Sequence, residues 1–184
     1  MDETTVKTAK INAKDNFTKS KISITEKELN LMEVTDFGLN DFENIGISVV
    51  LYVNTKKVCA KELYLSPYQI CPQHLHPNQG SSEGKEETFR CRSGIVFLYV
   101  EGENTENISA KIPDKYKDKF TVFNEIIMKP GQQYTLKPSM IHWFQGGPEG
   151  AILSEFSTHS DDDSDIFHDE NINRIAVDHL INNQ

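Results

Sequence analysis

Alternation between short apolar segments and turn-forming residues is the feature that most limits how this chain can fold. From Gly46 onward, strand-length segments rich in β-branched and aromatic residues are separated by groups such as residues 54–57, Pro130-Gly131 and residues 146–150. This pattern is typical of an antiparallel sandwich or barrel. We expect strands over residues 47–53, 58–65, 69–76, 87–92, 94–101, 124–128, 132–136 and 151–158.

The length of the chain favours a single domain. With 184 residues, 37% of them hydrophobic, it can fill one core well, so we expect one domain over residues 1–184. The first 22 or so residues are polar and lysine-rich, and they predict either a loosely ordered arm or an edge strand. Thr25 and Glu28 are spaced as a capping box, which predicts a short helix to about Met32, and helical spacing predicts a C-terminal helix over residues 172–182.

Charge and cysteine content exclude several kinds of partner. A formal charge of −9 and a pI near 5.1 disfavour binding to nucleic acid, which needs a basic surface. No apolar run approaches the roughly 20 residues that cross a bilayer, and the N-terminus does not resemble a signal peptide. Three cysteines without a CxxC pair fit a reducing compartment, so we expect a cytoplasmic protein.

Two histidines carry the first indication of chemistry. His74 and His76 stand two residues apart in an extended segment, so their side chains point to the same face. With one carboxylate and a third imidazole, such a pair can enclose a divalent metal ion. Because no cysteine belongs to the group, an open catalytic or substrate-binding site is favoured over a closed structural zinc site. On type alone, the carboxylate could be Glu86 or Glu87.

The wider pattern resembles the cupin superfamily. The histidine pair is followed by Glu87, then after six residues by Gly94, and the second motif has counterparts in Gly131, Pro138 and His142. The resemblance selects Glu87 over Glu86. It implies an all-β fold, a double-stranded β-helix or jelly-roll barrel with short peripheral helices, and it implies the metal ligands His74, His76, Glu87 and His142. Two departures are the ten residues between His76 and Glu87 and the position of Pro138, one residue closer to His142 than usual; the first can be accommodated as a rim loop.

One branch of that superfamily is a closer match. Residues 71–77, 84–94, 141–147 and 154–158 together look like the D-lyxose isomerase family, and the resemblance spans about residues 45–178. It implies a metal-dependent aldose–ketose isomerase that interconverts D-lyxose and D-xylulose and also acts on D-mannose and D-fructose. It further implies manganese, with iron, nickel, cobalt or zinc as alternatives.

The chemistry of isomerisation suggests two further residues. Moving a sugar carbonyl from C1 to C2 through an enediol requires stabilised negative oxygens, exclusion of water and an acid/base pair. Glu155 interrupts an apolar strand, which places its carboxylate either inside the barrel or in solvent at an edge. Lys85 lies two residues before Glu87 and would share its face, unless it is a solvated loop lysine. We predict that Glu155 and Lys85 are the catalytic pair.

Two other functions use the same ligands. An iron-dependent cupin dioxygenase and a non-catalytic sugar-binding cupin both remain open from the residues alone, although a pure binder needs neither Lys85 nor Glu155. We expect a small-molecule sugar substrate and a homodimer, because barrel edges favour pairing. We expect residues 161–163 to be a solvated loop and Asp165, Asp169 and Arg174 to close the site mouth or pair with a neighbouring subunit.

Overall fold

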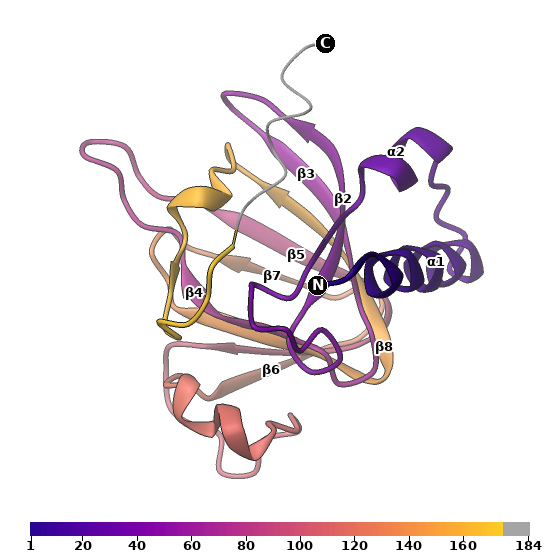
Figure 1. Ribbon diagram of the computed structural model, residues 1–184. Helices are drawn as coiled ribbons and strands as arrows, with labels where there is room; N and C mark the ends of the chain where they lie inside the picture. The colour runs from indigo at the N-terminus through magenta and orange to yellow at the C-terminus, as the bar shows by residue number, and fades with distance from the viewer. Residues whose placement is uncertain (175–184) are drawn as a thin grey trace.

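The computed structural model describes residues 1–174, which form two helices, two short 3₁₀ helices and nine strands (Figure 1). In chain order they are α1 (Glu3–Lys19), α2 (Glu26–Leu31), β1 (Glu33–Thr35), β2 (Ile47–Asn54), β3 (Cys59–Leu65), β4 (Ile70–Leu75), β5 (Glu87–Val100), η1 (Asp114–Lys119), β6 (Asn124–Met128), β7 (Gln133–Leu136), β8 (His142–Ser157), η2 (Asp162–Ser164) and β9 (Ile166–Phe167).

All nine strands belong to one curled sheet. Its main path runs β1-β2-β3-β8-β4-β9, and β5 pairs with β8 along its length, with β7 through its first half and with β6 through its second. The predicted hairpin of residues 47–65 and the predicted strands around residues 70, 126 and 134 are confirmed. Two predictions differ: residues 87–100 form one strand rather than two, and β8 begins at His142 rather than near residue 151.

The two long strands bend at glycines, and this bend closes the barrel. Gly94 has φ +72° and Gly150 has φ +76°, both in the region that favours glycine. A Cβ on Gly94 would lie 2.1 Å from the Gly150 carbonyl oxygen, so no side chain fits at this point of the β5–β8 ladder. The ladder register shifts twice beside Gly94, as expected of β-bulges.

The bend has a consequence for the site. A straight strand of 14 residues would span roughly 45 Å. Glu87 pairs near one end of the β5–β8 ladder and His142 at the other, yet their side chains meet at 3.1 Å. The sheet therefore curls until its two ends face each other across the barrel interior, which confirms the predicted all-β jelly-roll barrel.

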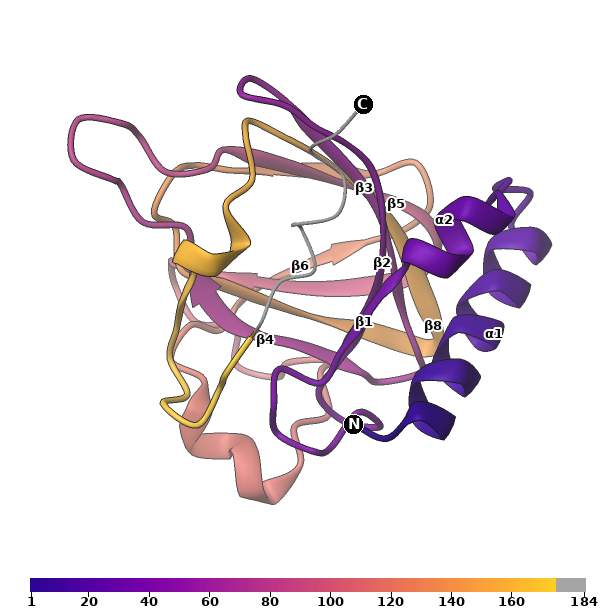
Figure 2. The same cartoon turned by 45° about the horizontal axis from the view of Figure 1, so that its top comes forward.

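The first residues correct the prediction of an arm or an edge strand, since they form the helix α1. Asp2 caps it by accepting a hydrogen bond from the Thr5 backbone at 2.7 Å. Its buried face is narrow, made of Ala9, Ala13 and Phe17, and it packs on the outside of the barrel beside β2 (Figure 2). Small alanines on a lysine-rich helix leave little hydrophobic periodicity, which explains the missed prediction.

One of the two predicted helices is confirmed, and the other lies mostly outside the described residues. The capping box of Thr25 and Glu28 is present, with both reciprocal hydrogen bonds, at the start of α2. The helix predicted over residues 172–182 falls almost entirely outside the described residues. Within the described part, no helix has the length and apolar character to cross a membrane.

Candidate metal centre

Three imidazoles gather inside one end of the barrel. His74 on β4 pairs in register with His142 at the start of β8, and His76 follows directly after β4. All three side chains are buried, and their candidate ligand nitrogens lie within 4.8 Å of one another. The structure thus brings together the three histidines that the sequence singled out.

Local hydrogen bonds orient the rings of His74 and His142. Nδ1 of His74 lies 2.8 Å from the Pro72 carbonyl oxygen, and Nδ1 of His142 lies 2.9 Å from the Met140 carbonyl oxygen. A carbonyl oxygen can only accept, so each Nδ1 carries a proton, and in a neutral ring Nε2 then presents a lone pair. The buried Nε2 of His142 has no hydrogen-bond partner among the described residues.

Glu87 completes the group. Its Oε1 lies 3.1 Å from Nε2 of His76 and 3.1 Å from Nε2 of His142, whereas Glu86 is exposed. Oε1 of Glu87 and the lone pair on Nε2 of His142 are both acceptors, so neither satisfies the other. A cation between these two atoms would satisfy both. The four residues therefore fit a divalent metal ion.

The pKa shifts of His74 and Glu87 favour metal binding, whereas that of His76 favours a competing proton. Burial, then the neighbouring His142 and His76, lower the pKa of His74 well below its usual range, which keeps it neutral. Burial raises the pKa of Glu87, but Lys85 and His76 outweigh it and hold that pKa well below the usual range. Burial lowers the pKa of His76, yet Glu87 and Asp165 raise it to about 9, so a metal ion would compete with a proton there.

Lys85 and Glu155 lie directly beside the candidate metal ligands. The Lys85 ammonium is 2.8 Å from Oε2 of Glu87 and 3.0 Å from Oε1 of Glu155. The side chains of Lys85 and Glu155 are 7% and 6% exposed, so Lys85 is not a solvated loop residue and Glu155 faces the interior. Burial lowers the pKa of Lys85, but Glu155 and Glu87 raise it well above its usual range. Their catalytic role stays a prediction.

Lys61 and Asp162 belong to the same buried charge cluster and were missed from the sequence. Lys61 is the cross-strand partner of Glu155, and its ammonium lies 3.9 Å from that carboxylate and 2.7 Å from Asp162. Asp162 is buried, which corrects the expectation of a solvated loop at residues 161–163. Strand alternation among Cys59, Lys61 and Leu63 could have indicated an inward lysine.

Of the three residues expected at the site mouth, two join the buried cluster and one does not. Asp165 contacts His76, with 2.5 Å between Oδ1 and Nδ1. Arg174 pairs with Asp165, Asp162 and Glu33, all within this chain. Asp169 instead pairs with Lys119, with 3.6 Å between the two charged groups.

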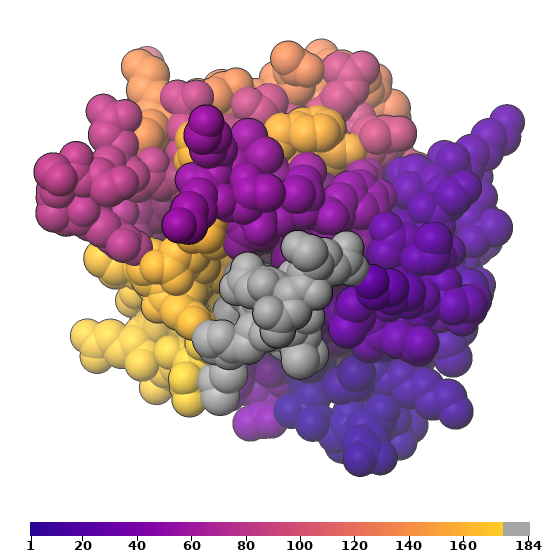
Figure 3. All heavy atoms as spheres, turned by 90° about the horizontal axis from the view of Figure 1, so that it is seen from above, coloured from indigo at the N-terminus to yellow at the C-terminus, as the bar shows by residue number. Residues whose placement is uncertain are grey.

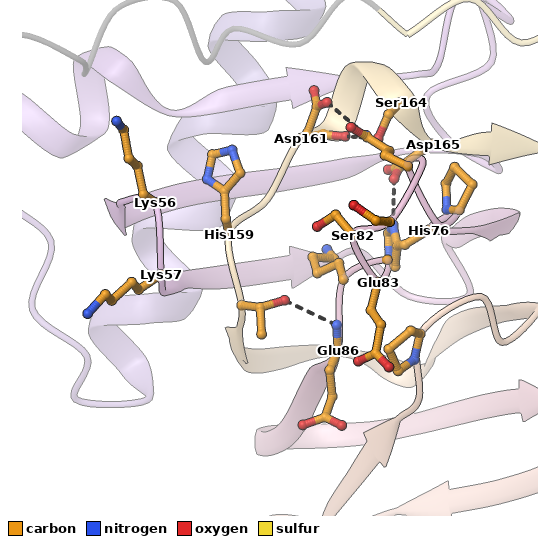
Figure 4. Close-up of a pocket in the computed structure, with 17 residues that line it drawn as sticks. Lys56, Lys57, His76, Ser82, Glu83, Glu86, His159, Asp161, Ser164 and Asp165 are labelled. Carbon is orange, nitrogen blue, oxygen red and sulfur yellow. Dashed lines mark hydrogen bonds and ion pairs between the residues drawn. The ribbon is translucent and has the colours of Figure 1, made fainter.

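Two cavities adjoin the cluster. The outer one, about 660 Å³, lies at the barrel rim between the loop of residues 77–86, the β2–β3 turn and the segment after β8, which are neighbours at this end of the molecule (Figures 3 and 4). The inner one, about 30 Å³, lies among the buried charges. His76, Lys85 and Asp165 line both cavities, so they stand where a molecule entering from the rim first meets the cluster.

Comparison with known proteins identifies the family. A sequence model of the D-lyxose isomerase family matches residues 8–179. The chain belongs to the D-lyxose isomerase family. It is therefore a member of a sugar isomerase family, as the resemblance implied.

The relatives match this chain in sequence along most of their length. The chain is 55% identical to the D-lyxose/D-mannose isomerase of Thermosediminibacter oceani over 85% of this chain and 87% of that protein. It is 52% identical to the D-lyxose ketol-isomerase of a Thermofilum species over 92% and 94%. Among solved structures, the L-ribose isomerase of Cellulomonas parahominis superposes with a TM-score of 0.77 over 94% of this chain and 95% of that one, at 12% identity, and so shows the fold.

Proposed function

We propose that this protein interconverts D-lyxose and D-xylulose, and also D-mannose and D-fructose, by proton transfer through an enediol. Substrate choice rests on the relatives, two of which are named for D-lyxose and one also for D-mannose. The observation that carries the mechanism is the position of Lys85, which bridges the ligand Glu87 and the carboxylate of Glu155 inside a buried cluster.

A divalent metal would be held by His74, His76, Glu87 and His142. We propose manganese, with iron, nickel, cobalt or zinc as alternatives, since imidazole and carboxylate ligands suit all of them. When bound, the metal supplies Lewis-acid stabilisation of the negative charge on the sugar oxygens.

We assign the role of base to Glu155. Its carboxylate lies between two ammonium groups, 3.0 Å from that of Lys85 and 3.9 Å from that of Lys61. In the forward reaction, Glu155 takes the proton from C2 of the open-chain aldose and returns it to C1. The burial of this cluster limits contact between bulk water and the charged enediol, while the proton on Glu155 can still exchange with solvent.

We assign to Lys85 the transfer of protons to and from the sugar oxygens. Its ammonium can donate to O1 as the C1 carbonyl becomes an enediol, and it can accept the O2 proton as the C2 carbonyl forms. The net change moves one hydrogen from C2 to C1 and one from O2 to O1, with no oxidant needed. Because Lys85 already donates to two carboxylates, a sugar would replace or share one of these contacts.

Incubation of the manganese-loaded protein with D-lyxose or D-mannose in deuterated water tests the proposal. We expect D-xylulose or D-fructose by NMR, with deuterium at C1, and no oxygen uptake. Glu155→Gln should greatly slow both turnover and labelling, whereas Glu86→Gln, on an exposed neighbouring carboxylate, should retain both. Absence of ketose from every aldose, or oxygen uptake that depends on sugar, would overturn the isomerase proposal.

We also propose a single domain, a homodimer and a cytoplasmic location, which rest on the arguments from chain length, barrel edges and cysteine content. Analytical ultracentrifugation tests the homodimer directly. A sedimentation coefficient of a 21.0 kDa monomer at micromolar concentration would contradict it.

A further inference from the structure

The three imidazoles are oriented by two different means. His74 and His142 each bond through Nδ1 to a backbone carbonyl two residues earlier, so the strand that carries them also fixes their rings. Among the described residues, His76 makes no such local bond. Its Nδ1 contacts the carboxylate of Asp165, 89 residues later in the chain (Figure 4). The orientation of one ligand therefore depends on a remote segment.

That segment, residues 159–168, we call the closing segment. It returns to the strand that leads into His76, because Phe167 and Ile166 pair with His74 and Leu75, and the His168 backbone donates to the Gln73 carbonyl at 3.0 Å. It also brings Ser160 and Asp162 onto Lys61. The closing segment is thus attached both to the ligand strand and to the charge cluster.

Asp165 is itself held firmly. Its side chain is 2% exposed, and its Oδ2, which has no hydrogen bond among the described residues, lies 3.5 Å from the Arg174 guanidinium. Arg174 is anchored in turn by Asp162 and by Glu33. A buried carboxylate aimed at Nδ1 of a metal ligand is the arrangement that fixes the tautomer and raises the basicity of that ligand.

We propose that Asp165 is a positioning residue for the metal ligand His76, and that metal binding and docking of the closing segment stabilise each other. This inference rests on the metal centre of the proposed function. Through Asp165, Nε2 of His76 is kept directed at Glu87 and the metal position. Because the coupling is reciprocal, whatever the docked segment adds to metal affinity, the metal adds to the docking of the segment.

Calorimetric titration of the metal-free protein with Mn²⁺ measures the first half of the proposal. Asp165→Ala should weaken binding about 10- to 100-fold, the range found when such partners of metal ligands are removed. Asp165→Asn keeps an acceptor oxygen and should lose less. Asp169→Asn is the matched control, since Asp169 lies just beyond the closing segment and pairs with Lys119 rather than a ligand, and it should bind Mn²⁺ as the wild type does.

Hydrogen exchange measures the second half. Mn²⁺ should slow amide exchange across residues 159–168 in the wild type and in Asp169→Asn, and much less in Asp165→Ala. Thermal unfolding of each metal-free variant shows whether it is folded; if Asp165→Ala is not, Asp165→Asn alone must show both effects.

The outcomes separate the two levels of inference. If the wild type binds no divalent metal, the metal centre itself is wrong. If the wild type binds Mn²⁺ and folded Asp165 variants bind it equally well, the centre stands and the positioning role is refuted. Metal that leaves exchange in the closing segment unchanged would refute the coupling.

Discussion

Two regions of this barrel bury polar side chains on the same two strands, and they do so in opposite ways. On β4, Gln73 and His74 are neighbours; on β8, His142 and Gln145 are three residues apart. The glutamines face the loop of residues 101–123, while the histidines face the interior cluster.

In both glutamines, the amide oxygen and the amide nitrogen have hydrogen-bond partners. Gln145 accepts from the Lys111 backbone at 2.8 Å and donates to the carbonyls of Tyr68 and Lys111 at 2.8 and 2.9 Å. Gln73 likewise accepts from the Thr121 backbone and donates to its hydroxyl. These neutral amides fix a loop to the barrel, which is a structural task.

The charged cluster is not satisfied in the same way. Nε2 of His142 and Oδ2 of Asp165 lack hydrogen-bond partners among the described residues, and Nε2 of His142 lies 3.1 Å from Oε1 of Glu87. Buried groups left in this state are costly unless a ligand completes them. The contrast teaches that the burial of polar atoms does not by itself indicate a site, whereas unsatisfied and converging atoms do.

The largest effect should come from the charged region. Glu155→Gln removes the proposed base without changing side-chain size, and it should lower kcat about 10²- to 10⁴-fold, the usual contribution of a general base. Steady-state assays with D-lyxose measure it, alongside Mn²⁺ titration to show that the metal is retained. Wild-type kcat in the variant would remove Glu155 from the mechanism.

Next in size is the loss of a buried ion pair. Asp162→Asn leaves Lys61 and Arg174 without their shared carboxylate, so unfolding free energy should fall by about 3–5 kcal/mol. Urea denaturation measures it, with the exposed Asp161→Asn as control. If both variants unfold alike, the cluster adds little to stability and the contrast with the glutamines weakens.

A smaller effect is expected in the neutral region. Gln145→Leu leaves the Lys111 backbone N–H and the Tyr68 carbonyl without their hydrogen-bond partner, which should lower the free energy of unfolding by about 1–3 kcal/mol. Because Gln145 has no contact with the metal ligands, kcat at saturating metal should be unchanged. A drop in kcat comparable to that of Glu155→Gln would show that the two regions are not separate.

The smallest effect is a narrow pH dependence. Burial raises the pKa of Asp162, but Arg174 and Lys61 outweigh it and hold the pKa well below the model-peptide value of 3.8. A carboxyl whose pKa is lower in the folded state contributes stability that is present above pH 3.8 and is lost as pH falls further. The stability gap between wild type and Asp162→Asn should be constant from pH 7 to 5 and should shrink below pH 4; a gap that widens in acid would reverse the assignment.

The sequence was most informative where local geometry determines proximity. Strand alternation places His74 and His76 on one face. The resemblance to the cupin motif, in which a glycine follows the glutamate after six residues, selects Glu87, so the ligand set could be proposed before the structure. The inward position of Glu155 was one of two alternatives, because alternation does not tell the interior from an outer edge.

Strand alternation could have shown that Lys61 points inward, but not which residues it meets, because these come together through tertiary register. Lys61 joins the cluster because β3 pairs with β8 in the register that sets it opposite Glu155, and no local pattern encodes that register. In the sequence, Asp162 is only one member of an acidic run. Its contact with Lys61 depends on the path of the closing segment in the folded protein. The helix α1 was missed because a buried face of two alanines and one phenylalanine is too small to produce a clear period.

The curled β5–β8 ladder also has a kinetic consequence. Glu87 and His142 are 55 positions apart in sequence and meet only after both long strands have paired and bent, so the complete ligand set forms late in folding. Divalent metal should therefore slow unfolding and leave the rate of refolding nearly unchanged, because its binding energy becomes available only after the rate-limiting assembly.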